Sequence, residues 1–342
     1  MRATIVDIKN RTGLSLATIS KYLNGGTVRP ENKEKIDEAV RTLNYRVNET
    51  ARSLVTNRTK TIGVIVYTVE NLFAGTMMHY IGEYFRQHGY GMFICDSNNN
   101  PEIEAENVKN MIQKNVDGIL MIPVGLRERY LPLLSSAGIP LVCLDRRFDD
   151  QSFDSVTINN RESSASLVEI LVRNGHSRIG YIGSEAEYTG RERAAGFREA
   201  MEQRGLSICT DYLYLKGMNL ATGYNGMKHL MGLSGPPTAV VMSNYEITLG
   251  AIMALRENGI EYPEKVSIVA FDNLMLSDIV SPRITIAVQP MEKMANSASE
   301  LLLSRIREDK KDSVLSPIRH IVYPAAIYEF ESVKKINGMG DS

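Results

Sequence analysis

The chain has 342 residues, of which 43% are hydrophobic and 23% charged, the composition of an ordinary globular protein with more than one domain. Its formal net charge is only −1, but residues 1–60 contain 12 Lys and Arg against 6 Asp and Glu, which leaves −7 on the remainder. No apolar signal core opens the sequence and no apolar run approaches membrane-spanning length, so we expect a cytoplasmic protein without a membrane partner. A basic head on an acidic body favours a polyanion-binding module, with a solvated basic face as the alternative.

The cysteines and histidines give no sign of a metal centre. Cys95, Cys143 and Cys209 lie far apart, and the five histidines have no metal-ligand spacing with each other or with cysteine. We therefore expect buried, reduced thiols and predict neither a metal nor a cofactor. The phosphate-loop, dinucleotide-binding and hydrolase-elbow motifs are also absent, so an enzyme is not expected.

The first 46 residues have the pattern of three short helices. Thr4 followed by Asp7 is typical of a helix start, because a hydroxyl can accept from a free backbone N–H and a carboxylate suits the positive helix end. Gly13 then provides a tight turn, Ser15 caps a second helix, and Pro30 opens a third. This arrangement predicts a helix-turn-helix unit.

The second helix of this unit has one apolar and one polar face. Ile19 and Leu23 lie one turn apart and should face the small core, which leaves the opposite face free to enter a DNA major groove. Lys21 is the best candidate for a guanine contact, although these residues could also be only surface and capping residues. The predicted base-edge and phosphate contacts of the head are Thr4, Ser15, Leu16, Ala17, Thr18, Ser20, Lys21, Asn24 and Tyr45.

From Thr61 onwards, apolar runs alternate with helical stretches. This alternation predicts parallel sheets that are covered by helices on both faces. The expected strands are 62–66, 92–95, 118–122, 141–144, 179–182, 239–242 and 266–270, and the expected helices are 75–88, 102–114, 160–174, 190–204, 244–258 and 290–308.

Polar residues that follow these strands are candidates for a ligand site, because ligands of open parallel sheets lie beyond the carboxyl ends of the strands. Carboxylates, amides and guanidinium groups at such positions suit a hydroxyl-rich ligand. The predicted effector-binding residues are Thr68, Phe73, Asp96, Arg146, Arg191, Met218, Asn244 and Asp272.

Several sequence runs together resemble one known family. These runs are Thr4–Ile8, Leu14–Ser15, Thr18–Gly25, Leu43–Arg46, Ala51–Leu54, Thr61–Val66, Val116–Leu120, Gly196–Met201 and Val269–Asp272. In this order they resemble the LacI/GalR (lactose-repressor) family of transcription regulators, over essentially the whole chain.

The resemblance implies an all-α helix-turn-helix head plus an α/β two-lobed, periplasmic-binding-protein-like (type I) body with parallel sheets. The head would be 1–46, the hinge helix and linker 47–60, and the effector-binding and dimerisation domain 61–332, with a flexible tail over 333–342. The first lobe would comprise about 61–159 and 290–321, and the second about 160–289 and 322–332. In the hinge, Leu54 would wedge into the minor groove and Ala51 would allow close helix approach, while Val47 replaces the family's usual proline.

Some positions depart from the family pattern and affect the expected ligand. Met218 stands where an aromatic residue is frequent, and Tyr245 stands where Asp is common. By resemblance Arg191, Asn244 and Asp272 are the strongest candidates. Arg146 together with Arg191 would favour a sugar acid or sugar phosphate, unless a neighbouring carboxylate neutralises either arginine.

The function predicted from these observations is a homodimeric repressor of carbohydrate metabolism genes that binds near-palindromic double-stranded operator DNA, is controlled by a sugar-like effector, and is nucleoid-associated when bound. No leucine heptads follow Phe330, so a tetramer is not expected. Two alternatives remain open: control by a phosphoprotein corepressor, and a sugar-binding protein that does not bind DNA.

Overall fold

The computed structural model describes residues 3–46, 52–53, 58–125, 130–272, 274–308 and 317–336. The chain divides into two compact units, Met1–Lys60 and Thr61–Ser342. The hinge residues Val47, Ala51 and Leu54 lie outside the described residues, while Arg52 and Ser53 between them are helical. The predicted roles of Ala51 and Leu54 therefore stay predictions.

The first unit is the predicted bundle of three short helices. Asp7 accepts hydrogen bonds from the backbone N–H and the hydroxyl of Thr4, both at 2.8 Å, and Ser15 accepts from the backbone N–H of Thr18 at 3.1 Å. These caps satisfy N–H groups that a helix start leaves free. The fully buried core comprises Ile8, Ile19, Ile36 and Ala39. The helices are α1 Ile5–Thr12, α2 Leu16–Leu23 and α3 Pro30–Thr42.

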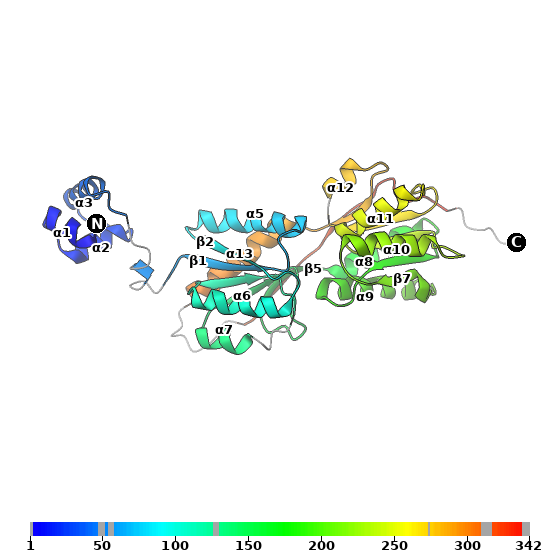
Figure 1. Ribbon diagram of the computed structural model, residues 1–342, viewed down its shortest axis with the longest axis horizontal. Helices are drawn as coiled ribbons and strands as arrows, with labels where there is room; N and C mark the ends of the chain where they lie inside the picture. Colours follow the sequence, from blue (N-terminus) through cyan, green and yellow to red (C-terminus); the bar gives the residue numbers. More distant parts are fainter. Residues whose placement is uncertain are drawn as a thin grey trace. The chain divides into compact units, whose positions relative to one another are not determined.

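The second unit contains two six-stranded sheets, each in its own lobe (Figure 1). The sheet of the first lobe has the order β11-β5-β4-β3-β1-β2 and is parallel throughout. Helices α5 and α13 cover one of its faces, and α6 and α7 cover the other. The strands are β1 Thr61–Val66, β2 Gly91–Asp96, β3 Gly118–Met121, β4 Leu141–Leu144, β5 Asp154–Ile158 and β11 His320–Tyr323; the helices are α5 Leu72–Gln87, α6 Pro101–Gln113, α7 Leu131–Ala137 and α13 Met291–Arg307.

The sheet of the second lobe has the order β12-β10-β9-β8-β6-β7, and only β12 runs antiparallel to its neighbour among the described strands. Helices α8 and α9 pack on one face, and α10 and α11 on the other. The strands are β6 Ile179–Gly183, β7 Leu213–Leu215, β8 Ala239–Met242, β9 Ser267–Phe271, β10 Thr285–Val288 and β12 Ala326–Tyr328; the helices are α8 Asn160–Arg173, α9 Tyr188–Gln203, α10 Leu220–Met231, α11 Tyr245–Glu257 and α12 Leu274–Ile279.

Helices α10 and α11 approach each other through glycine. A Cβ atom on Gly223 would lie 2.0 Å from the carbonyl oxygen of Ile247, and one on Gly250 would lie 2.0 Å from the carbonyl oxygen of Leu220. Both distances are far below van der Waals contact, so only glycine permits this approach at the two positions.

The observed elements differ from the sequence prediction in several places. Strands β5, β7, β10, β11 and β12 and helices α7, α10 and α12 were not predicted. The third passage between the lobes falls between Tyr323 and Ala326, slightly after the predicted position near Val322.

The end of the chain and one cysteine also differ from expectation. Residues 333–336 were expected in a flexible tail, but the backbone N–H of Lys334 donates to Ser267 Oγ and that of Ile336 donates to the Asn174 carbonyl. Cys143 is buried and Cys95 partly buried, whereas Cys209 is exposed because it lies in the surface turn before Thr210.

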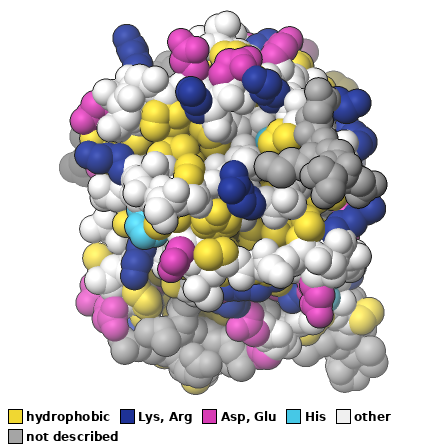
Figure 2. Space-filling view, turned by 90° about the vertical axis from the view of Figure 1, so that its right-hand side faces the viewer, with side chains coloured by type: hydrophobic (Ala, Val, Ile, Leu, Met, Phe, Trp, Pro, Cys, Tyr) yellow, Lys and Arg dark blue, Asp and Glu magenta, His cyan; other side chains and the backbone are white. Residues whose placement is uncertain are grey.

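One face of the molecule carries side chains of mixed character. On the face in Figure 2, acidic, basic and hydrophobic side chains are interspersed, without one continuous basic area. Within the described ranges, no helix has both the length and the apolarity that crossing a bilayer requires.

Candidate functional site

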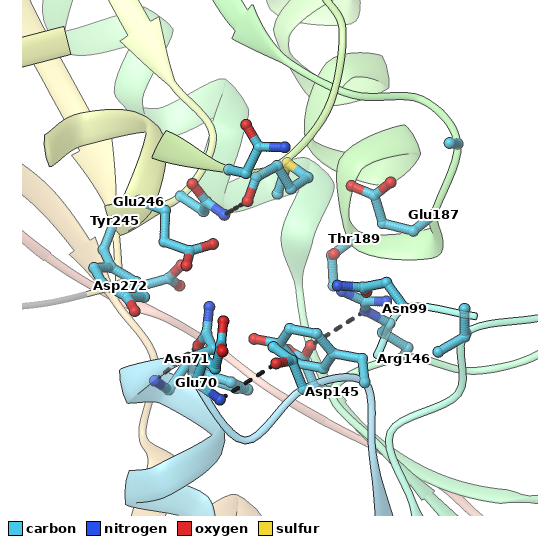
Figure 3. A pocket seen from close by; sticks show the side chains of 18 of the residues that line it. Glu70, Asn71, Asn99, Asp145, Arg146, Glu187, Thr189, Tyr245, Glu246 and Asp272 are labelled. Carbon is cyan, nitrogen blue, oxygen red and sulfur yellow. Dashed lines mark hydrogen bonds and ion pairs between the residues drawn. The ribbon is translucent and has the colours of Figure 1, made fainter. Parts of the chain in front are cut away.

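A cavity of about 480 Å³ lies between the two lobes, at the carboxyl ends of strands from both sheets (Figure 3). Its size is within the usual range of small-molecule sites. Loops after β1, β4, β6, β7, β8 and β9 contribute side chains, as expected for parallel sheets. The lining residues are Tyr67, Thr68, Glu70, Asn71, Phe73, Asn98, Asn99, Val124, Asp145, Arg146, Ala186, Glu187, Thr189, Arg193, Met218, Asn219, Asn244, Tyr245, Glu246, Asp272 and Gln289.

Six of the eight predicted effector residues line this cavity: Thr68, Phe73, Arg146, Met218, Asn244 and Asp272. Two do not. Asp96 instead shapes an adjacent loop, accepting hydrogen bonds from the backbone N–H of Val69 at 3.1 Å and of Asn98 at 2.6 Å. Arg191 donates to Asp149 at 2.6 Å and to the Ala186 carbonyl at 3.1 Å, so it is occupied outside the cavity.

Arg193 is the arginine of α9 that reaches the cavity, and sequence reasoning missed it. Its guanidinium donates to Asn160 Oδ1 at 2.8 Å and to the Ser243 carbonyl at 2.5 Å, and it lies 3.4 Å from both carboxylate oxygens of Asp272. The group also stacks 4.1 Å from the centre of the Phe271 ring. With a side chain only 2% exposed, Arg193 is a buried cation that this network compensates.

Helical spacing could have identified Arg193. Residues Gly190, Gly196 and Phe197 are buried and lie three or four positions from it, so Arg193 belongs to the inward face of α9. Arg191 is two positions away and faces elsewhere.

In the first lobe, Asp145 and Arg146 form the corresponding charged pair. The guanidinium Nε lies 3.9 Å from a carboxylate oxygen of Asp145, and the guanidinium carbon lies 4.5 Å from the centre of the Tyr67 ring. Burial raises the pKa of Asp145 to about 6, against the opposing effect of Arg146. Asp145 is therefore the neighbouring carboxylate that could neutralise Arg146, an alternative that the sequence analysis allowed.

Asn244 has its polar atoms engaged within the protein. Its Oδ1 accepts from the backbone N–H of Ile247 at 2.8 Å and its Nδ2 donates to the Met218 carbonyl at 2.9 Å. The amide thus caps α11 and fixes the loop before α10, which leaves it less able to hydrogen-bond a ligand than the sequence suggested.

Contacts between the lobes flank the cavity. The Tyr245 hydroxyl, on the second lobe, accepts a hydrogen bond from the backbone N–H of Leu72 on the first. The Arg191–Asp149 ion pair and the Arg147 guanidinium, 5.5 Å from the centre of the Tyr188 ring, also join the two lobes.

The predicted DNA-contacting face of the head is accessible. Leu16 is 41% exposed although it is apolar, and Ser15, Ala17 and Lys21 next to it are also exposed. An exposed leucine at the start of a helix can contact thymine methyl groups. Of the other predicted contacts, Thr4 and Asn24 are exposed, Thr18 and Ser20 are partly buried, and Tyr45 packs against the small core.

Known proteins resemble this chain over nearly its full length. A family of periplasmic-binding-protein-like domains matches residues 168–323. The HTH-type transcriptional regulator RegA of Clostridium saccharobutylicum is 31% identical over 323 residues, 94% of this chain and 97% of that protein. The HTH-type transcriptional repressor PurR of Actinobacillus pleuropneumoniae serotype 3 is 33% identical over 310 residues, 90% of this chain and 92% of that protein. The lac repressor dimer bound to operator and the anti-inducer ONPF has the same fold, with a TM-score of 0.84, 19% identity, and coverage of 98% of this chain and 100% of that chain.

A three-helix head and a two-lobed body with a cavity at its strand ends define a helix-turn-helix transcription regulator with a periplasmic-binding-protein-like body. The chain belongs to the LacI family of transcription regulators. Members of this family are not enzymes.

Proposed function

We propose that this protein is a homodimeric repressor of carbohydrate metabolism genes, and that a small hydroxyl-rich effector bound in the cavity controls its affinity for near-palindromic operator DNA. One observation is the main support for an effector site in this cavity. Within the described chain, four polar atoms of cavity-lining residues are buried and have no hydrogen-bond partner: Asp145 Oδ1, Arg146 Nε, Glu187 Oε1 and Gln289 Oε1. Unpaired buried polar atoms are costly, and a polar ligand would satisfy them.

The proposed mechanism couples lobe closure to the heads of the dimer. A ligand that contacts both lobes favours the closure state in which it makes more contacts, and it shifts the equilibrium by that difference in affinity. Closure would change the spacing of the two first lobes, and with it the contact between hinge segments near Ala51 and Leu54. A typical coupling energy of about 1–3 kcal/mol would change operator affinity by about 5- to 150-fold.

Two structural neighbours support a sugar-like effector. A LacI family regulator from Enterococcus faecium was solved with bound ribose, and the regulator CelR was solved with cellobiose. Both share the fold of this chain at TM-scores of 0.72 and 0.71. The cavity of this chain is polar and lies at the carboxyl ends of parallel strands, so it has the chemistry to bind a related molecule.

The first experiment is a fluorescence-anisotropy titration of the purified protein against near-palindromic duplexes and a scrambled duplex, at two salt concentrations. We expect salt-dependent binding with a preference for one palindrome, because phosphate contacts give the salt dependence and base contacts the preference. Sequence-indifferent binding at both salts would contradict specific operator recognition. Specific binding that appears only after a phosphoprotein is added would favour a protein corepressor.

A further inference from the structure

The charged side chains of the cavity are mostly acidic. Five carboxylates line it, those of Glu70, Asp145, Glu187, Glu246 and Asp272, against the two guanidinium groups of Arg146 and Arg193. Both guanidinium groups already have a carboxylate neighbour, because Arg193 pairs with Asp272 and Arg146 with Asp145. These two pairs leave Glu70, Glu187 and Glu246 as the uncompensated charges.

These three glutamates come from both lobes. Glu70 follows β1 in the first lobe, whereas Glu187 precedes α9 and Glu246 lies in the first turn of α11 in the second. None of the three has an ion-pair partner in the part of the chain that the structure describes. In Figure 3, both Glu246 and Glu70 lie in the left part of the view, Glu246 above on the second lobe and Glu70 below on the first.

The electrostatic surroundings of Glu246 agree with the absence of an ion-pair partner for it among the described residues. Burial raises the pKa of Glu246, and the negative charges of Asp272 and Glu70 raise it further, while a hydrogen bond from Asn71 lowers it. No cation contributes to the shift. The carboxylate therefore lies where positive charge is missing.

The buried polar atoms that have no hydrogen-bond partner also favour a ligand that donates hydrogen bonds. Three of the four are acceptors, on Asp145, Glu187 and Gln289, and one is a donor, on Arg146. Asp145 is 5% exposed and Gln289 4% exposed, so bulk water does not readily satisfy them. A ligand that completes this cavity must bring more donors than acceptors.

A bare metal ion does not fit this requirement. Among the described residues, no three acidic, histidine or cysteine side chains are arranged to hold one. An organic cation suits carboxylates that are spread around a cavity, because its hydroxyl and amine groups can reach several of them at once.

We propose that the effector is a small hydroxyl-bearing molecule with a protonated amine, and that the ammonium group binds between Glu70 and Glu246. This proposal rests on the assignment of the cavity as the effector site. An ammonium group supplies three donors and one positive charge. It would also cancel the repulsion between carboxylates that face each other from the two lobes, so its binding would favour closure. A sugar acid or sugar phosphate would add negative charge to a region that already has an excess.

The test is calorimetric titration of the full chain, without DNA, with a matched set of ligands. The amines are D-glucosamine, D-galactosamine and D-mannosamine, and each is compared with its parent hexose and the corresponding uronic acid. We expect at least one amine to bind about tenfold or more tightly than its hexose, because a hydrogen bond between two charged groups is stronger than one from a neutral hydroxyl. The uronic acids should bind most weakly.

Variants of Glu70 and Glu246 test whether these two carboxylates cause the preference for the amine. Glu246→Gln and Glu70→Gln should each weaken amine binding about tenfold and weaken hexose binding much less, whereas Glu83→Gln, on the exposed part of α5, should change neither. Circular dichroism would verify that the variants are folded. The proposal is overturned if a hexose or uronic acid binds as tightly as its amine, if no amine binds, or if Glu246→Gln keeps the amine preference. Because DNA is absent, these outcomes are separate from a failure of operator binding.

Discussion

The backbone N–H of Leu72 donates a 2.8 Å hydrogen bond to the hydroxyl of Tyr245, and the two residues belong to different lobes. Leu72 is the first residue of α5 and Tyr245 the first residue of α11. The Tyr245 ring also packs within the core of the first lobe. One side chain of the second lobe is thus anchored in the first, beside the cavity.

Replacing Tyr245 with Phe should loosen this anchor while it keeps the apolar packing. The loss of the hydrogen bond should cost about 1 kcal/mol of interlobe stability, because Asn71 already accepts from Phe73 and Ala74 and cannot satisfy Leu72. Small-angle scattering of the ligand-free protein should show a larger radius of gyration for the variant. Tyr262→Phe is the matched control, since its hydroxyl bonds to Pro282 within one lobe. Equal scattering for both variants would contradict the anchoring role.

Arg193→Met should strongly destabilise the second lobe. The change leaves the buried carboxylate of Asp272 without its guanidinium partner, and removal of one member of a buried pair typically costs about 3–5 kcal/mol. Urea unfolding followed by circular dichroism measures this loss. The control is Arg161→Met, which breaks more exposed pairs with Glu192 and Glu199 and should cost less than about 1 kcal/mol. Similar midpoints for the two variants would refute a special role of Arg193.

Glu104 should make the stability of the first lobe depend on pH. It is fully buried and accepts from the backbone N–H of Val124 at 2.6 Å and of Gly125 at 3.3 Å, and from the Tyr130 hydroxyl at 3.1 Å. Burial outweighs these bonds and raises its pKa from 4.5 to about 7. Because the folded state holds this proton more tightly than the unfolded state, stability should fall as pH rises from about 4.5 to about 7.

Melting temperatures of the wild type, Glu104→Gln and Glu106→Gln across this pH range test the prediction. The glutamine at 104 cannot lose a proton, so that variant should gain stability relative to the wild type as pH rises to about 7 and keep a constant difference above it. Glu106 is exposed on the same helix, and its variant should follow the wild type. Parallel curves for all three proteins would rule out the effect.

Lys21→Ala should reduce operator preference as well as affinity. The side chain is exposed, and its aliphatic part lies beside Gly26, where an added Cβ would be 2.7 Å from Lys21 Cγ. If Lys21 contacts a guanine edge, the variant should lose about 1–3 kcal/mol on the preferred palindrome and less on a scrambled duplex. Lys33→Ala, exposed on α3, is the control in the same anisotropy assay. Equal losses by Lys21→Ala on both duplexes would indicate a phosphate contact instead.

The sequence predicted those elements whose patterns are local. The three head helices follow from caps and turns such as Thr4 with Asp7 and Gly13, and strands such as β1 and β8 follow from uninterrupted apolar runs. Strand β5, in contrast, contains Asp154, Ser155 and Thr157, which are buried only because of partners distant in the sequence. Asp154, for example, pairs with Arg305.

The difference between local patterns and distant contacts also explains which residues near the cavity the sequence did not predict. Thr68 and Asp272 follow strands and could be placed from the sequence. Helix α10 was missed because Gly223 and Gly226 lower its helix propensity, and it forms through packing on α11. Glu246 lies in the first turn of a helix, where an acidic residue is common for reasons unrelated to ligands, so only the three-dimensional neighbourhood shows the missing positive charge.

The close contact at Gly223 and Gly250 also bears on how this cavity can change during evolution. Helices α10 and α11 touch through their backbones, so neither can shift without the other, and the loops that precede them carry Met218 and Asn244 to fixed positions. Substitutions at such loop and helix-start positions exchange chemical groups without moving the helices behind them. A new ligand preference can therefore arise in single steps, through altered charge or size at the helix starts, without any change in the packing of the two helices.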